Sequence, residues 1–148
     1  RRVAVINGPL ENPAAADRLV GYRESLEDLF DGALTVSTGW DSASGFEAMR
    51  RLLEAHPDID GVLAGSDRIA VGAMGALALA GRSVPGDVSV IGFDDHAVAA
   101  TSTPPLTTVR QPMLQEGRIA AELALAMVDG EPPRTVVLAM ELIERASV

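Results

Sequence analysis

The sequence predicts an α/β fold in which helices cover both faces of a parallel β-sheet. Short apolar runs alternate with segments of helical periodicity, and Gly, Pro, Asn and Asp residues separate them. Parallel strands need a crossover between them, so this alternation with short connections favours right-handed β-α-β units. A chain of 148 residues is long enough for one compact domain with a core that needs no covalent staples.

The first two thirds of the chain contain four strands and three helices in alternation. Asn12-Pro13 supplies a capping side chain and a first helical residue, and Ser66 can cap the third helix, which is rich in Gly and Ala. The predicted elements are a strand at 3–6, a helix from 13 to about Phe30, a strand at 34–37, a helix capped by Asp41 or Ser42 and ended by His56-Pro57, a strand at 61–64, a helix from Ser66 to Gly81, and a strand at 88–91.

The pattern changes after Asp95. Residues 96–105 are small, polar and rich in Pro, which indicates a boundary between a lobe at 1–105 and a β-α-β tail at 106–148. In the tail we predict a strand at 106–109, a helix at 113–128 and a last strand beginning within 136–140.

Composition and motifs exclude several classes of function. The chain has no Cys and no Lys, so thiolate metal sites, Cys nucleophiles and Schiff-base chemistry are excluded. A net charge of −9 disfavours direct binding of a nucleic-acid backbone. No hydrolase elbow or zinc-binding motif occurs and there are two His, so we expect no enzyme activity, no cofactor and no metal. No apolar run approaches the roughly 18 residues of a membrane span, and no signal-peptide pattern opens the chain.

Polar residues gather where the predicted strands end, which is where open parallel sheets bind ligands. Trp40 follows the second strand, Asp94 follows the fourth, and Arg18 lies near the start of the first helix at the same rim. A guanidinium group and a carboxylate hold paired hydroxyls in forked hydrogen bonds, and an aromatic ring covers the apolar face of a sugar. This set of residues suits a polyhydroxylated ligand.

These residues also have purely structural interpretations, and an enzyme is a further alternative. The chain could be a lobe of a flavodoxin-like enzyme, although no motif supports this. Adjacent strand-end carboxylates tend to point in opposite directions, which disfavours a catalytic pair. The structural alternatives are a surface ion pair of Arg18 with Asp17 or Glu11, a half-buried loop ring for Trp40, a helix N-terminal charge for Asp67, and a solvated turn at Asp94-Asp95.

Several strings in the sequence are characteristic of a known family. The most specific are VPGDVSVIGFDD at 84–95 and PPLTTVRQP at 104–112. With Gly8-Pro9-Leu10, Arg18 to Tyr22, Ser44-Gly45-Phe46 and Gly65-Ser66-Asp67, they resemble the second lobe of the effector-binding domain in the LacI/GalR family of bacterial transcription regulators. The resemblance covers essentially the whole chain.

The resemblance implies a two-lobed effector-binding domain, similar to periplasmic sugar-binding proteins, in a cytoplasmic homodimer whose N-terminal helix-turn-helix binds operator DNA. It implies that Arg18 and Asp94 hydrogen-bond the hydroxyls of a carbohydrate effector, that Trp40 stacks on it, and that Ser66 stands where many relatives have Asn. Gln111 would be a hinge or pocket residue, and the dimer interface would include Val71, Met74 and Ser102. A sugar-binding protein of a transport system is the alternative.

The chain also departs from the family pattern. It lacks the DNA-binding headpiece and the first half of the sensor, so we expect half of the effector cleft to be missing. The helix at 113–128 and the strand at 136–140 would pack in that first lobe, which leaves Ile119, Leu123 and Met127 without their usual cover. We expect the chain to dimerise or to dock its tail in another position.

Overall fold

The computed structural model describes all residues from 1 to 148 and contains one six-stranded sheet. The strand order is β2-β1-β3-β4-β5-β6, and every pair of neighbours is parallel except β5 and β6. The predicted α/β fold is therefore confirmed. The strands are β1 (Val3–Asn7), β2 (Thr35–Ser37), β3 (Gly61–Ala64), β4 (Ser89–Asp94), β5 (Thr107–Arg110) and β6 (Glu141–Ile143).

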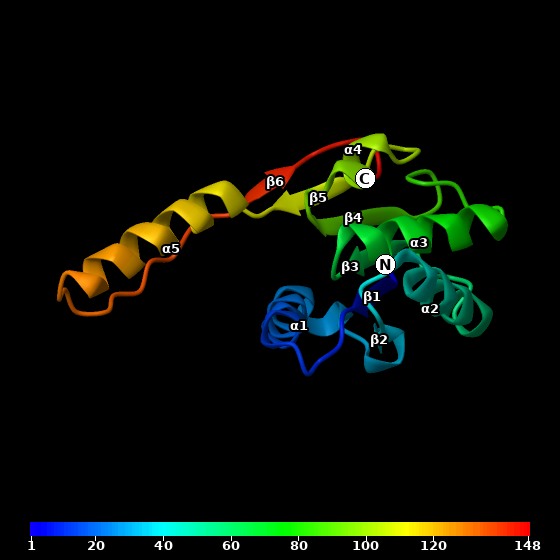
Figure 1. Cartoon of the computed structure of the whole chain (residues 1–148). Coiled ribbons are helices and arrows are strands. Elements are labelled where there is room, and N and C mark those ends of the chain that lie inside the picture. The colour runs from blue at the N-terminus through cyan, green and yellow to red at the C-terminus, as the bar shows by residue number, and fades with distance from the viewer.

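Helices cover both faces of the sheet. Figure 1 shows α1 on one side of the strands and α2 and α3 on the other, as right-handed crossovers require for this strand order. The helices are α1 (Pro13–Leu26), α2 (Ser42–Ala55), α3 (Asp67–Leu79), α4 (Ala97–Thr101) and α5 (Met113–Val128), with short 3-10 helices η1 (Glu27–Leu29) and η2 (Gly32–Leu34). None of them combines the length and the apolar character that crossing a bilayer requires.

The predicted helix caps are confirmed. The side chains of Asn12, Asp41 and Ser66 each accept a hydrogen bond from a backbone N–H in the first turn of α1, α2 and α3. Each of these bonds satisfies a donor that the helix itself leaves free. The caps fix where each helix starts after its strand, and so they fix the loops at the carboxyl edge of the sheet.

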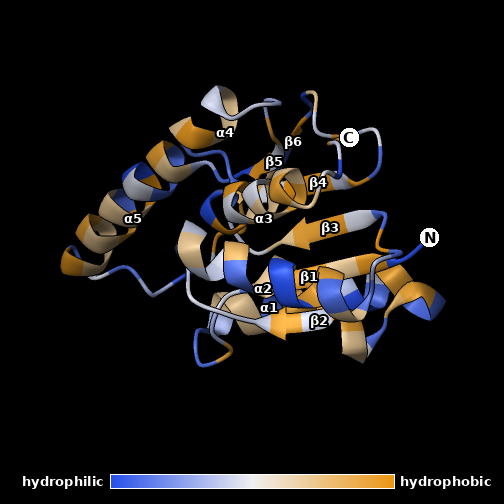
Figure 2. Cartoon of the chain, turned by 90° about the vertical axis from the view of Figure 1, so that its right-hand side faces the viewer, coloured by the Kyte–Doolittle hydropathy of each residue, from blue (hydrophilic) through white to orange (hydrophobic).

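The core lies mainly between the sheet and the pair α2–α3. Ile6, Val62 and Val90 are fully or almost fully buried and belong to one apolar cluster with Leu77 of α3, and the apolar colouring of β1 and β3 is clear in Figure 2. At Gly72 a side-chain carbon would lie 2.8 Å from the backbone nitrogen of Phe46 in α2. The small residues of the third helix therefore serve tight packing inside this lobe.

The first helix is shorter than predicted. We expected it to reach about Phe30, but α1 ends at Leu26 and Glu27 takes a φ of 48°. This left-handed residue breaks the helix, and η1 follows. The apolar spacing continued to Leu29, but that side chain is exposed, so it buries nothing that would extend the helix.

The prediction for the last strand is wrong. Residues 136–140 form no strand; β6 instead covers Glu141–Ile143, within the segment expected to be a tail, and it pairs antiparallel with β5. Figure 1 shows the physical reason: after α5 the chain runs back beside that helix and reaches the edge of the sheet only at β6. Beyond it, the buried Ser147 hydroxyl accepts from the Thr107 N–H and donates to the Val90 carbonyl, which fastens the C-terminus to the sheet.

The helix α5 has the predicted bounds but projects away from the lobe (Figure 1). None of its residues is buried, and Leu114 and Val128 are more than four-fifths exposed. In the single chain the tail therefore does not dock in another position, which was one of the two expected alternatives. Ile119 and Leu123 are half-buried and Met127 is exposed. Dimerisation and the division of the chain at residue 105 stay predictions, while β5 continues the sheet beside β4.

Candidate ligand-binding site

The candidate site lies at the carboxyl edge of the sheet. The chain leaves β1 toward β2 on one side and later places β3 on the other, so the order reverses between β1 and β3. At such a reversal the connecting loops diverge and leave a crevice, which is where ligands bind in open α/β sheets. The loops that follow β1, β2, β3 and β4 all begin at this edge.

Trp40, Ser66 and Asp94 line one hollow of about 240 Å³, together with Arg68 and His96. The Trp40 ring lies over Gly8, where a side-chain carbon would come within 2.5 Å of a ring atom, so glycine is needed there. The Ser66 hydroxyl accepts from the Ile69 N–H at 3.3 Å, which leaves its own proton free to be donated. The hollow therefore offers a ring face, a hydroxyl and a carboxylate.

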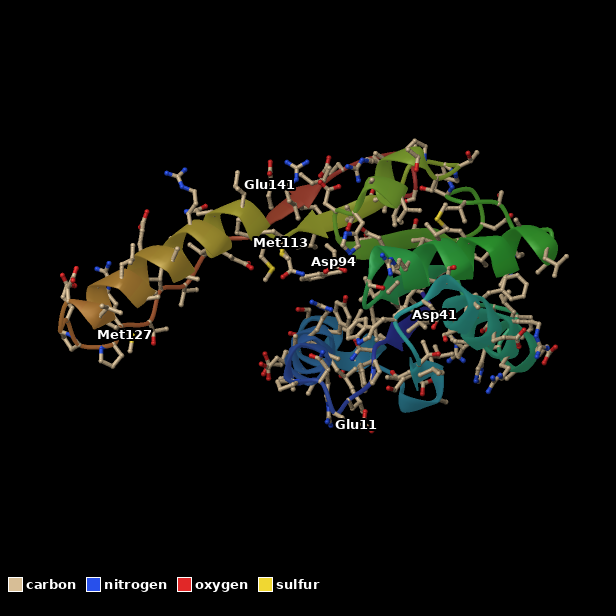
Figure 3. All side chains as sticks on the ribbon, in the orientation of Figure 1. Glu11, Asp41, Asp94, Met113, Met127 and Glu141 are labelled. Atoms are coloured by element: carbon tan, nitrogen blue, oxygen red, sulfur yellow. The ribbon has the colours of Figure 1, made fainter.

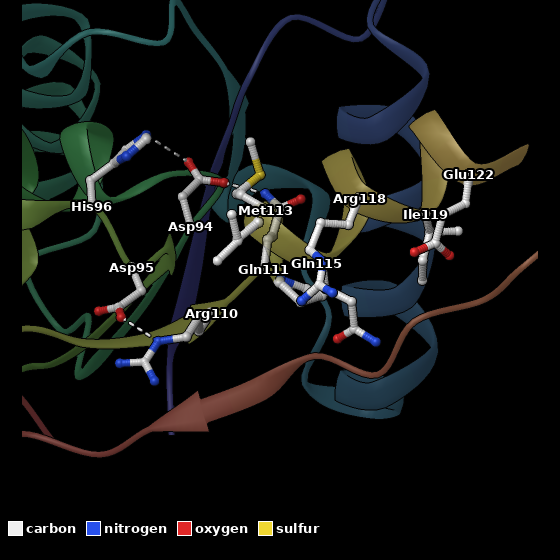
Figure 4. Close-up of a pocket in the computed structure, with 12 residues that line it drawn as sticks. Asp94, Asp95, His96, Arg110, Gln111, Met113, Gln115, Arg118, Ile119 and Glu122 are labelled. Atoms are coloured by element: carbon white, nitrogen blue, oxygen red, sulfur yellow. Dashed lines mark hydrogen bonds and ion pairs between the residues drawn. The ribbon is translucent and has the colours of Figure 1, made fainter. Parts of the chain in front are cut away.

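Asp94 stands at the end of β4 and is held by its neighbours (Figure 4). Its Oδ1 accepts from Gln111 Nε2 at 2.5 Å, and its Oδ2 lies 3.7 Å from His96 Nε2. Gln111 can reach it because β5 runs parallel to β4 and pairs Asp94 with Arg110. The carboxylate keeps acceptor capacity toward the hollow, since a carboxylate can accept about four hydrogen bonds.

Arg18 lies in a neighbouring hollow of about 470 Å³ that Tyr22, Phe93 and Gln111 also line. Its guanidinium carbon is 3.6 Å from the centre of the Phe93 ring, and Nη1 donates to the Gly65 carbonyl at 2.6 Å. The alternative of a surface ion pair with Asp17 or Glu11 is therefore wrong. Stacking and one hydrogen bond orient the group and leave most of its five N–H donors free.

Tyr22 supports the wall beneath Arg18. Its hydroxyl donates to the Ala64 carbonyl at 3.4 Å. Burial raises the pKa of Tyr22 to about 12, the nearby Arg18 charge lowers it, and the Asp94 charge raises it. Tyr22 is therefore a neutral hydroxyl at physiological pH, and its ring contributes an apolar surface to the site.

A third hollow, of about 870 Å³, opens between the end of the sheet and the first turns of α5 (Figure 4). Asp94 and Met113 lie at its base, where α5 leaves the lobe (Figure 3). Asp94 also lines the Trp40 hollow, and Gln111 also lines the Arg18 hollow. The three hollows thus meet at the Asp94–Gln111 pair, which joins the five predicted site residues into one region.

Asp95 has a role that the sequence did not reveal. Its Oδ2 accepts from Arg110 Nε at 2.7 Å and its Oδ1 from Arg145 Nη2 at 2.6 Å, so the solvated turn is wrong. Asp94 and Asp95 have separate partners, as expected for adjacent strand-end residues. Burial alone would raise the pKa of Asp95, but hydrogen bonds from Arg145 and Arg110 bring it below its ordinary value. Arg145 lies fifty residues away in sequence, and no local pattern links it to Asp95.

Phe93 and Tyr22 also belong to the site, although the sequence alone did not indicate them. Two-residue alternation was a usable signal for Phe93, because Val90 and Gly92 are buried toward α3 and intervening residues must face α1. Asp67 was considered only as a charge at a helix N-terminus, yet it is fully buried and its carboxylate accepts two hydrogen bonds.

The residues predicted for a dimer interface lie away from this edge and do not share one hollow. Val71 lines a groove between α2 and α3 with Phe46, whereas Met74 is buried beside Thr103 and Pro104. The Ser102 hydroxyl is bonded to the carbonyls of Ala99 and Pro104 within the chain. No group of three His, Asp or Glu side chains is placed to hold a metal ion.

Comparisons with known proteins identify the family of this chain. A family described as periplasmic binding protein-like domain matches residues 1–148. The HTH-type transcriptional regulator CelR of Thermobifida fusca is 41% identical over 144 residues, which is 95% of this chain and 42% of CelR. The ribose operon repressor of Escherichia coli K12 is 39% identical over 128 residues, or 84% of this chain and 38% of the repressor. The chain thus spans about two fifths of the length of these curated relatives.

Solved structures extend the similarity to three dimensions. The complex of the transcriptional regulator CelR with cellobiose has a TM-score of 0.94 and 39% identity, and the match covers all of this chain and 47% of that one. A sugar-binding LacI-family regulator from Escherichia coli, solved with phosphate, has a TM-score of 0.90 and 34% identity over 99% of this chain and 54% of that one. This chain belongs to the periplasmic binding protein-like domain family, among the LacI-type transcriptional regulators.

Proposed function

We propose that the chain is part of the effector-binding domain of a LacI-type transcriptional regulator and that it binds a carbohydrate at the carboxyl edge of its sheet. The observation that carries the proposal is the convergence of Trp40, Ser66 and Asp94 on one hollow, joined through Gln111 to the hollow of Arg18. In this proposal Arg18 donates to effector hydroxyls, Asp94 accepts from them, and the Trp40 ring covers an apolar sugar face.

The groups present suit a neutral polyhydroxylated ligand. The guanidinium group of Arg18 is oriented by Phe93 and Gly65, so little side-chain entropy is lost when a ligand binds. Asp94 and Ser66 supply an acceptor and a hydroxyl from adjacent strand ends. The CelR complex holds cellobiose, which makes this disaccharide a reasonable first probe.

The effector acts by favouring one arrangement of two lobes. We propose that residues 1–105 form one lobe, that 106–148 contribute to the other, and that further residues outside this chain complete the cleft and supply the DNA-binding helix-turn-helix. A ligand shifts such an equilibrium only by its difference in affinity for the two states, commonly about 1–3 kcal/mol. Operator DNA would meet the helix-turn-helix and not this acidic chain, whose net charge is −9.

The similarity to the same relatives also supports proposals about location, oligomeric state and enzymatic activity. We propose a cytoplasmic homodimer with Val71, Met74 and Ser102 at the interface, and no enzymatic activity, because the relatives named above are transcriptional regulators. The same relatives favour a regulator over a transport protein.

The proposal is tested by calorimetry on the full-length protein with cellobiose and a panel of neutral mono- and disaccharides. Each hydrogen bond to a charged group is worth roughly 1.5–3 kcal/mol, so Arg18→Ala and Asp94→Asn should each weaken binding about 10- to 100-fold. Arg23→Ala is the matched control, because Arg23 lies on the same helix but stacks on Phe30, away from the site.

If the wild-type protein binds none of the sugars, the proposed ligand class is wrong. If a sugar binds and both site variants keep the affinity of the Arg23→Ala control, the site is wrong.

A further inference from the structure

Asp67 is a fully buried carboxylate beside the candidate site and is not among the residues that line the hollow. It is the first residue of α3, and its side chain is turned toward the turn between β4 and α4. Its Oδ2 accepts from the backbone N–H of His96 at 2.7 Å, and its Oδ1 accepts from the hydroxyl of Thr108 in β5 at 2.5 Å. Both carboxylate oxygens therefore have a specific donor, which a general helix-dipole charge would not need.

The turn that Asp67 contacts has an unusual backbone. Asp94 has a φ of 107° and Asp95 a φ of 56°, although neither is glycine. Side-chain sterics disfavour this region for L-residues, so surrounding contacts must hold the two residues there. The Thr108 hydroxyl that donates to Asp67 also accepts from the Asp95 N–H at 3.4 Å. Asp67 and Thr108 thus hold the turn at two successive backbone N–H groups, those of Asp95 and His96.

The packing leaves little room for Asp67 to turn elsewhere. A side-chain carbon at Gly92 would lie 2.7 Å from Leu106 and closer still to the Asp67 carboxylate. Glycine at this position of β4 is what lets the carboxylate approach the strand. Asp94 is two residues further along the same strand, at the point where the backbone turns.

We propose that Asp67 is a positioning residue for effector binding: together with Thr108 it holds the Asp94–Asp95 turn in its left-handed conformation, so that the Asp94 carboxylate faces the hollow beside Gln111. The inference rests on the proposed function, because the benefit of fixing Asp94 is binding of the effector. Removing Asp67 or Thr108 should release the turn and lower affinity only through Asp94.

The first test needs no ligand. In the full-length protein, NMR couplings that report φ at residues 94 and 95 and hydrogen exchange at the His96 amide are compared between wild type, Asp67→Ala and Thr108→Val. Thr108→Val keeps the volume of the side chain and guards against a variant that fails to fold. Both variants should lose the left-handed couplings, and Asp67→Ala should lose protection of the His96 amide. Unchanged couplings and protection would overturn the inference.

The second test is a double-mutant cycle with the cellobiose and sugar panel described above. Asp67→Ala and Thr108→Val should each weaken binding by about tenfold or more in a wild-type background and should have no further effect in an Asp94→Ala background. Thr35→Val is the control, because the Thr35 hydroxyl also donates a hydrogen bond within the chain, to the Asp31 carbonyl, but in distant β2.

The outcomes separate the two ideas. If Asp94→Ala weakens binding but Asp67→Ala does not, the positioning role is wrong and the proposed function stands. If Asp67→Ala weakens binding equally with and without Asp94, it acts on general stability and the inference is also overturned. If the turn is released in the first test and no sugar binds the wild type, the proposed function fails, and with it the role of Asp67 in binding.

Discussion

Substitution of Gly72 by Ala tests how closely α2 and α3 pack. A side-chain carbon at this position would lie 2.8 Å from the Phe46 backbone nitrogen and closer still to the Ser42 carbonyl oxygen. Both are backbone atoms of α2 and cannot rotate away, so the helices must separate by roughly 1 Å to restore ordinary contact. Overpacking of this kind costs about 2–3 kcal/mol, and the better helix propensity of Ala returns about 1 kcal/mol.

We therefore expect Gly72→Ala to lower the free energy of unfolding by about 1–2 kcal/mol, or Tm by about 2–8 °C, in a chain of this size. Gly21→Ala is the matched control: it is also inside a helix, α1, but nothing lies within 4 Å of the added carbon. That variant should gain about 0.5–1 kcal/mol. Urea unfolding of both variants decides the matter, and a Gly72→Ala protein as stable as wild type would refute the reasoning.

Three further predictions concern buried groups. Hydrogen bonds from two guanidinium groups outweigh burial and lower the pKa of Asp95, so its stabilisation is present above about pH 4 and is lost as pH falls through the lowered pKa. Asp95→Asn should therefore cost stability near neutral pH and progressively less in acid, as measured by urea unfolding, and an equal cost at both would contradict this. Tyr22 is the only Tyr in the 148 residues, so its ionisation can be followed by the ultraviolet absorbance of tyrosinate. As the pH of the folded chain is raised, this absorbance should increase with a midpoint near pH 12, and not near the usual pKa of about 10. Leu77→Ala should destabilise by about 2–5 kcal/mol because Leu77 is fully buried, whereas Leu79→Ala, at a side chain 76% exposed, should change stability by less than about 0.5 kcal/mol.

The local signals in the sequence predicted most of the fold. Helix caps such as Asp41 and Ser66 depend on interactions between residues close in sequence, and so do the apolar runs of the strands. The elements that these signals predicted are present. Predictions failed where a distant partner decides the structure. A strand exists only where another strand is available, so β6 begins where the chain reaches β5 and not at the apolar residues before it.

The candidate site shows the same division. The types and approximate positions of Arg18, Trp40 and Asp94 were predictable, because strand ends share one edge of a parallel sheet. The groups that orient them were harder to find: Phe93 beneath Arg18 follows from alternation along β4, but the contacts of Asp67 with Thr108 and His96 join three elements. Contacts between residues that are far apart in sequence leave no recognisable pattern in the sequence.

The central claim is that one sugar-sized site is formed at the carboxyl edge by residues from separate loops. The most direct measurement is an NMR titration of the full-length protein with the sugar panel, following the indole N–H of Trp40 and the guanidinium Nε–H of Arg18, each assigned by substitution. The account predicts that both signals shift with one sugar and saturate with the same dissociation constant. Shifts confined to the groove between α2 and α3, or two signals that saturate independently, would contradict it.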